Sequence, residues 1–264
     1  MSTGTVLVTG ASSGIGAVYA DRFAARGHDL ILTARRADRL EAAAKILADR
    51  YGVAVRAVTA DLADRDGLAR VEAIVASDPA ITHLVNNAGV ASTDPLAVSS
   101  PDEMERMIAV NVTAPMRLAR AAAQAFAARG AGTIVNIASV VAVAPERLNA
   151  VYSGSKAFVL AFSHRLRLEL EGSGVRLQVV LPGVTRTDLW EPAGGLDSMP
   201  AEIVMSADDL VDAALIGLDR GEYATIPSLH VLGEWEAWEA ARQAMLPHLS
   251  NARVAPRYRV EAPA

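Results

Sequence analysis

The sequence has no cysteine and almost no lysine. Without cysteine, disulfides, thiolate metal sites and cysteine nucleophiles are excluded. Lys45 and Lys156 are the only lysines among 25 basic residues, and the others are arginines. An ammonium is a compact point charge, whereas a guanidinium is a planar fork. A lysine retained in so arginine-rich a chain indicates a place that requires a point charge, which makes Lys156 a candidate functional residue.

Positive charge and long apolar runs are also scarce. The net charge of −5 offers nucleic acid or an anionic membrane no electrostatic attraction. The apolar run at 133–145 is too short to span a bilayer. The first predicted strand begins within five residues of Met1, which leaves no room for a signal peptide. We therefore expect a soluble, cytoplasmic protein without a nucleic-acid or membrane partner.

The first 26 residues read as a strand, a glycine-rich turn and a helix. Residues 5–9 are apolar, Gly10, Gly14 and Gly16 follow, and a helical pattern continues through Arg26. This arrangement presents backbone N–H groups and a helix N-terminus to a phosphate. A glycine-rich turn alone is a weak signal, but the flanking strand and helix are the context that a dinucleotide site requires.

The end of the second predicted strand, 29–34, distinguishes between two cofactors. An NAD site would carry an acidic residue there, on the ribose 2′-hydroxyl. Instead Ala34 is followed by Arg35 and Arg36, and guanidinium groups bind a 2′-phosphate through charge-assisted hydrogen bonds. We therefore favour NADP(H) over NAD(H). The alternative is that both arginines only begin a solvated helix over 37–50.

Polar or small residues also follow the next two predicted strands. Strand 53–60 leads to Asp61 and Leu62, which could hold the adenine amino group and cover the ring. Asp61 could equally be the N-cap of a helix over 63–77. Strand 82–85 leads to the tight turn at 86–89, at the sheet edge where open α/β folds bind ligands.

Two polar features mark the middle of the chain. Asn111 interrupts a long apolar helix predicted over 101–129, where a buried asparagine needs partners. The apolar run 133–138 reads as a buried strand that ends at Ser139, whose hydroxyl could hold a substrate oxygen.

Tyr152 and Lys156 lie four residues apart, on one face of a helix predicted to continue to about Glu171. A nearby cation favours phenolate and should lower the tyrosine pKa, which is normally about 10. Such a tyrosine can act as a general acid and base. The alternative is an ordinary pair of neighbours on an amphipathic helix.

The rest of the chain continues the alternation of strand and helix. Strand 175–181 ends in a Pro-Gly turn, and the irregular stretch 188–206 reads as a substrate lid. A helix over 207–220 and a strand over 223–226 complete the pattern. We predict an α/β fold, a Rossmann-type doubly wound parallel sheet of about seven strands with helices on both faces. It forms a single domain over 1–264, with a variable C-terminal extension at about 227–264, helical over 231–247.

In combination, these motifs resemble those of the short-chain dehydrogenase/reductase family over roughly residues 5–190. Each motif is weak alone, but their joint order and spacing are specific. They are Thr9-Gly10-x-x-x-Gly14-Ile15-Gly16, Asp61-Leu62, Asn86-Asn87-Ala88-Gly89, Asn111, Ser139, Tyr152-x-x-x-Lys156 and Pro182-Gly183.

The resemblance implies a role for each catalytic residue. Tyr152 would be the general acid and base, and Ser139 would hold the carbonyl oxygen. Lys156 would lower the Tyr152 pKa and bind the nicotinamide ribose, while Asn111 would anchor a water of a proton relay. The implied cofactor-binding residues are Gly10, Ser12, Ser13, Gly14, Ile15, Arg35, Arg36, Asp61, Leu62, Asn87, Ala88, Gly89, Tyr152, Lys156, Pro182, Gly183, Thr185 and Thr187.

The predicted activity is NADP(H)-dependent interconversion of a ketone or aldehyde and an alcohol, without a metal. Apolar residues after Ser139 and in the predicted lid favour a small, moderately apolar substrate. Two alternatives remain, a nonenzymatic NADP-binding regulator or scaffold and a sugar-nucleotide epimerase or dehydratase. We also expect a homo-oligomer, a dimer or tetramer, because helices 101–129 and 151–171 carry more apolar surface than one sheet face can cover.

Overall fold

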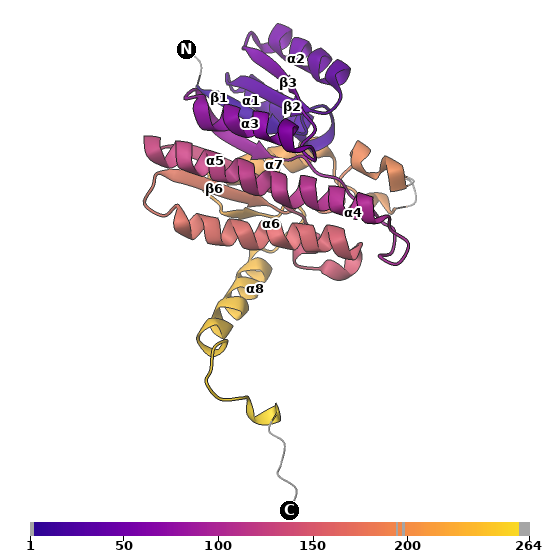
Figure 1. Cartoon of the computed structure of the whole chain (residues 1–264), viewed down its shortest axis with the longest axis vertical. Coiled ribbons are helices and arrows are strands. Elements are labelled where there is room, and N and C mark those ends of the chain that lie inside the picture. The colour runs from indigo at the N-terminus through magenta and orange to yellow at the C-terminus, as the bar shows by residue number, and fades with distance from the viewer. Residues whose placement is uncertain (1–2, 194, 197–198, 259–264) are drawn as a thin grey trace, which may run out of the picture. The chain divides into compact units, whose positions relative to one another are not determined.

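The computed structural model describes residues 3–193, 195–196 and 199–258 (Figure 1). The chain divides into two compact units, Met1–Ser228 and Leu229–Ala264. Three residues of the predicted lid, Gly194, Asp197 and Ser198, lie outside the described residues. The part of the predicted C-terminal extension from 259 to 264 also lies outside them.

The first unit is built on one parallel sheet of seven strands in the order β3-β2-β1-β4-β5-β6-β7. This order confirms the predicted doubly wound sheet, because the crossovers reverse direction between β1 and β4. The strands are β1 (Thr5–Thr9), β2 (Asp29–Ala34), β3 (Val55–Thr59), β4 (Ile81–Asn86), β5 (Gly132–Ile137), β6 (Val175–Val180) and β7 (Ala224–Thr225).

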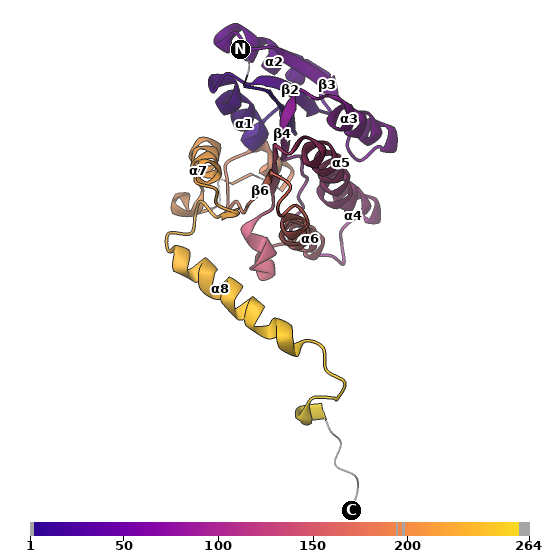
Figure 2. The ribbon, with the colours of Figure 1, turned by 90° about the vertical axis from the view of Figure 1, so that its left-hand side faces the viewer.

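Helices cover both faces of the sheet, which is why its strands are apolar on both sides (Figure 2). One face packs against α1 (Gly14–Ala25), α2 (Ala37–Tyr51) and α7 (Ala207–Asp219). The other packs against α3 (Arg65–Ser77), α5 (Ala114–Arg129) and α6 (Ala150–Glu169).

The long helix predicted over 101–129 is interrupted in its middle. It consists of α4 (Pro101–Ile108), a π-helical turn (Ala109–Thr113) and α5. Pro115 has no N–H to give to the carbonyl of Asn111, which would be its acceptor in a regular α-helix. The turn widens at that point, and π turns of this kind often mark functional sites.

A short pairing closes the base of the segment after β6. Thr185 and Met205 form an isolated parallel bridge, with Arg186 N–H donating to the Met205 carbonyl at 2.9 Å. Between them lie 3₁₀ turns at Asp188–Ala193 and Ala201–Ile203, within the stretch predicted to be irregular. The buried Trp190 donates from Nε1 to the Thr185 carbonyl at 3.1 Å and anchors the segment at its start.

The C-terminal unit contains α8 (Leu232–Met245), within the stretch predicted to be helical. The Trp235 and Trp238 rings stack with their centroids 5.0 Å apart. None of the residues of α8 is buried. Across the described parts of the whole chain, every helix is too short or too polar to cross a membrane.

Candidate active site

The predicted site residues gather at the carboxyl ends of the strands. Gly10 follows β1, Arg35 follows β2, Asn87 follows β4 and Ser139 follows β5 shortly after Ile137. Asp61 comes two residues after β3, and the Pro182–Thr187 segment follows β6. This edge of an open parallel sheet is where α/β folds bind ligands.

The glycine-rich turn brings the end of β1 close to the start of α1. A Cβ on Gly16 would lie 2.3 Å from the Gly10 carbonyl oxygen, so strand and helix approach each other closely. Gly10 and Gly14 both have positive φ, of 67° and 55°. Ser13 caps α1 without a side-chain hydrogen bond within the described residues, so the N–H groups of the first turn remain available to an anion. The chemistry of this turn fits a dinucleotide.

Thr9 holds the turn after β4 in place. Its hydroxyl oxygen accepts from the N–H groups of Asn87 and Ala88, both at 2.9 Å. In return, the Asn87 side chain donates from Nδ2 to the Thr9 carbonyl at 2.9 Å. Sequence reasoning gave Thr9 no role of its own. The sequence signal that could have indicated its role is a threonine at the end of an apolar strand, directly before the glycine-rich turn.

Three arginines, rather than the two that were predicted, stand at the start of α2. Arg35 and Arg36 are exposed beside the end of β2, as a 2′-phosphate site requires. Arg39, one helical turn further, pairs at 3.5 Å with Asp188, the first residue of the predicted lid segment. Sequence reasoning missed Arg39 because its partner lies 149 residues away.

Asp61 is not the cap of the helix that follows it. That role belongs to Asp64, whose carboxylate accepts from the Gly67 N–H at 2.7 Å. The alternative reading of Asp61 as an N-cap is therefore wrong. Its carboxylate instead pairs with Arg106 on α4 at 2.8 Å, while Leu62 beside it is buried.

The side chains of Tyr152 and Ser139 are both buried and are hydrogen-bonded to each other. Burial raises the pKa of the Tyr152 phenol to about 12, and a hydrogen bond with Ser139 offsets only part of that rise. The predicted lowering of this pKa is therefore wrong. Desolvation is the dominant cause, although Lys156 Nζ lies 5.7 Å from the centroid of the Tyr152 ring.

Lys156 is buried as well and makes one main-chain contact. Its Nζ donates to the Ile137 carbonyl at 3.0 Å. Burial lowers the pKa of this ammonium to about 8. Gly89 lies between the lysine and Asn111, since a Cβ there would be 3.6 Å from Lys156 Nζ and 3.4 Å from Asn111 Oδ1. The residues predicted to be catalytic therefore converge on one place.

Both amide protons and the amide oxygen of the Asn111 side chain are hydrogen-bonded to protein groups. Its Nδ2 donates to the Val90 carbonyl at 2.9 Å, and its Oδ1 accepts from the Val90 N–H at 2.9 Å. The second Nδ2 proton goes to Ser155 Oγ at 3.1 Å, and Ser155 donates to the Tyr152 carbonyl at 2.7 Å. Ser155 was not predicted as a site residue, although it stands directly before Lys156.

A second buried chain of hydrogen bonds ties α6 to the sheet. Asn86 Nδ2 donates to Asn136 Oδ1 at 3.0 Å, and Asn136 Nδ2 donates to Ser163 Oγ at 2.9 Å. Asn86 and Asn136 are register partners on β4 and β5. These hydrogen bonds fix the position of α6 along strands β4 and β5, and with it the positions of Tyr152 and Lys156.

The start of the segment after β6 completes the site. The Pro182 carbonyl accepts from the Val140 N–H at 2.9 Å and from Ser139 Oγ at 3.3 Å. Thr185 Oγ1 donates to the Gly183 carbonyl at 3.1 Å. A Cβ on Gly14 would touch Thr187 Cγ2 at 3.0 Å, so this segment closes over the glycine-rich turn.

Comparison with known proteins identifies the fold family. The model for short chain dehydrogenases matches residues 4–194. The chain belongs to the short-chain dehydrogenase family. As a member, it is an NAD(P)-dependent oxidoreductase that interconverts alcohol and carbonyl groups, and the nonenzymatic alternative is not favoured.

Several short-chain dehydrogenases match the chain nearly end to end. A short-chain dehydrogenase from Sphingobium yanoikuyae, solved in complex with NADPH, is 50% identical with a TM-score of 0.94, covering 97% of this chain and 100% of that one. A bulky-bulky ketone specific alcohol dehydrogenase from Comamonas testosteroni is 43% identical with a TM-score of 0.91, covering 98% and 99%. A sulfoacetaldehyde reductase from Chromohalobacter salexigens is 35% identical over 90% of this chain and 97% of its own.

Proposed function

We propose that this protein is an NADP(H)-dependent carbonyl reductase, and in reverse an alcohol dehydrogenase, for moderately apolar ketones or aldehydes. The observation that carries the proposal is the convergence of Ser139, Tyr152, Lys156 and Asn111 beside Gly89. Ser139 and Tyr152 can bind a substrate oxygen, and Lys156 is a titratable cation. Asn111 is hydrogen-bonded to Ser155 on α6.

Tyr152 is the proton donor for carbonyl reduction. Its raised pKa keeps the phenol protonated at neutral pH, which is the form that a general acid requires. Ser139 and Tyr152 both donate to the substrate oxygen, where negative charge develops during reduction. A protonated Lys156 stabilises the phenolate that is left behind.

Lys156 returns the proton through the region around Asn111. Because both Nδ2 protons of Asn111 go to protein groups, the side chain has no donor left for a water. Its main-chain carbonyl lacks an α-helical donor at Pro115 and is the group that would hold a relay water. The amide side chain then fixes the position of that carbonyl relative to α6.

The cofactor, when bound, supplies the hydride. The residues of this chain that would hold it are the glycine-rich turn for the pyrophosphate, Asn87–Gly89 and Lys156 for the nicotinamide ribose, and Pro182–Thr187 for the nicotinamide. Arg35 and Arg36 would bind the 2′-phosphate and make NADP(H) preferred over NAD(H). In support, the similar Sphingobium yanoikuyae dehydrogenase was solved with NADPH.

The substrate would be an apolar carbonyl compound enclosed by the 188–206 segment, which we propose to be a lid. Leu196 and Trp190 in this segment are buried. In support, the similar Comamonas testosteroni enzyme is specific for bulky-bulky ketones. We also propose a cytoplasmic location, and a single catalytic domain that carries the C-terminal extension.

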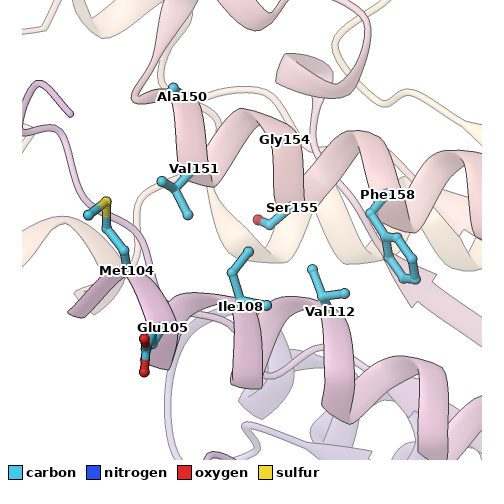
Figure 3. A pocket seen from close by; sticks show the side chains of 9 residues that line it. All are labelled: Met104, Glu105, Ile108, Val112, Ala150, Val151, Gly154, Ser155 and Phe158. Carbon is cyan, nitrogen blue, oxygen red and sulfur yellow. The ribbon is translucent and has the colours of Figure 1, made fainter. Parts of the chain in front are cut away.

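We further propose that the protein forms a homo-oligomer through the face made by α4, α5 and α6. An open cavity of about 600 Å³ lies between α4 and α6. Figure 3 shows Met104, Ile108 and Val112 pointing toward Val151 and Phe158 across it. Ile108 and Met116 are exposed large hydrophobic residues along the same ridge. Such a patch on an enzyme surface is typical of an interface between subunits.

Cofactor titration followed by a ketone panel tests the function. We expect NADPH to bind more tightly than NADH, and ketones to be reduced with loss of nicotinamide absorbance. Tyr152→Phe should bind NADPH normally and lose about 10³-fold in kcat. Tyr51→Phe is the matched control, because it removes a hydroxyl that donates to Asp21 at 2.9 Å, away from the site. Full activity of Tyr152→Phe would contradict the proposal.

A further inference from the structure

The carboxylate of Asp61 is held by one arginine. Arg106 Nη2 donates to both oxygens, at 3.1 Å to Oδ1 and 2.8 Å to Oδ2. The Ala63 N–H adds a third hydrogen bond, at 2.9 Å to Oδ1. A carboxylate oxygen accepts about two hydrogen bonds. Oδ1 is therefore saturated, and among the residues that the structure describes Oδ2 keeps one free acceptor position.

The ionised state of Asp61 is secured by the same contacts. Partial burial raises its pKa, but the hydrogen bonds from Arg106 and Ala63 and the nearby Arg35 guanidinium outweigh it, so the pKa stays below its usual range. An ionised carboxylate can accept hydrogen bonds and cannot donate them. The free position on Oδ2 therefore selects for a donor.

The position of this acceptor suits one part of the proposed cofactor. Asp61 follows β3 at the same sheet edge as Arg35 after β2, and Leu62 packs beside it. The adenine of a dinucleotide lying on the glycine-rich turn reaches this end of the sheet. Its exocyclic amino group is a donor, whereas the corresponding group of hypoxanthine is a carbonyl acceptor.

We propose that Arg106 is a positioning residue for base recognition, which fixes the Asp61 carboxylate so that Oδ2 accepts from the adenine amino group. This inference rests on the proposed function. Arg106 lies on α4, a helix with no residue in the predicted site. The inference makes this helix contribute to the discrimination between adenine and hypoxanthine.

The test compares the binding of NADPH and of reduced nicotinamide hypoxanthine dinucleotide phosphate, measured by calorimetry or fluorescence. We expect the wild type to bind NADPH about tenfold more tightly than the hypoxanthine analogue. Arg106→Gln should bring this ratio close to one, and Arg106→Lys should restore part of it. Arg117→Gln, which removes the Arg117–Glu72 pair between α5 and α3, is the matched control and should keep the full ratio.

A second variant guards against misfolding of Arg106→Gln. Asp61→Asn can rotate its amide to face either base, so it should also lose the discrimination while melting near the wild-type temperature. Equal binding of both dinucleotides to the wild type, or an unchanged ratio in Arg106→Gln, overturns the inference alone. If the wild type binds neither dinucleotide, the proposed function is overturned together with it.

Discussion

Lys156 and Tyr152 show how burial sets the chemistry of single side chains. The ammonium pKa is lowered to about 8 and the phenol pKa is raised to about 12, both by desolvation. The neutral form of each group is favoured, which leaves the lysine ready to titrate just above physiological pH. The tyrosine remains an acid until its proton is drawn to a substrate oxygen.

The pH dependence of catalysis should follow from Lys156. Because kcat/KM reports the free enzyme, kcat/KM for NADPH should fall about tenfold per pH unit above a pKa of about 8, as Lys156 loses its proton. In Lys156→Arg, kcat/KM should be lower than in the wild type and should no longer fall above that pH. Lys45→Arg, a change of the exposed lysine on α2, should keep the wild-type profile. A flat wild-type profile to pH 10 would contradict this role.

A partly buried histidine should make the fold sensitive to acid. His83 packs with its ring centroid 5.1 Å from that of His28, and desolvation lowers the His83 pKa to about 4. The unfolded chain therefore binds more protons between pH 6.5 and 4, and stability is lost as pH falls through that window. We expect a loss of about 3 kcal/mol from this residue by pH 4.

Denaturant unfolding at pH 7 and pH 4 measures this effect. His83→Phe should lose less stability between the two pH values than the wild type. His248→Phe, at an exposed position, should behave as the wild type does. An identical pH dependence in wild type and His83→Phe would refute the assignment.

At the scale of elements, the contact between β1 and α1 depends on a missing side chain. A Cβ on Gly16 would overlap the Gly10 carbonyl oxygen at 2.3 Å, and that oxygen belongs to the backbone and cannot swing away. Gly16→Ala should therefore cost about 3 kcal/mol of unfolding free energy and weaken NADPH binding at least about tenfold. Thermal melts and cofactor titration measure the two effects.

Gly154 offers the control for that substitution. It also lies in a helix, but a Cβ there meets no described atom within 4 Å. Gly154→Ala should leave the melting temperature unchanged or raise it, since alanine favours a helix by about 1 kcal/mol over glycine. Equal melting temperatures for the two variants would show that the turn tolerates a side chain.

The sequence predicted most of the strands and helices, because the spacing of apolar residues and the positions of glycines are local signals. It did not predict the π turn, since the spacing of the apolar residues alone does not distinguish a π turn from the α-helix on either side of it. It also missed Arg106, which meets Asp61 across 45 residues through tertiary packing alone. The direction of the Tyr152 pKa shift required the depth of burial, which spacing along a helix does not reveal.

At the scale of the whole molecule, the proposed homo-oligomer would pair the ridge of α4 and α5 with the same ridge of a second copy. Ile108, Val112 and Met116 recur every four residues, with the exposed Glu105 before them and the exposed Arg120 after them. A twofold axis near Val112 would set Ile108 against Met116 of a second copy, and Glu105 against its Arg120. This pairing of opposite charges fits an antiparallel helix interface.

Charge reversal tests that assembly. Glu105→Arg and Arg120→Glu should each raise the dissociation constant of the oligomer about tenfold or more, because like charges then meet across the axis. The double variant should recover most of the loss. Analytical ultracentrifugation over a range of concentrations measures it. A monomeric wild type, or single variants that assemble normally, would contradict this interface.

The uneven burial of the two lysines has a practical consequence for chemical modification. The side chain of Lys45 is 76% exposed on α2, whereas Lys156 is 5% exposed. An amine-reactive dye or resin would therefore attach, besides the amino terminus, at Lys45 and leave the native catalytic lysine untouched. All molecules immobilised through the Lys45 side chain would therefore be attached at the same point of the surface. Reagents that modify arginine would react at other surface positions, because the remaining basic residues are arginines.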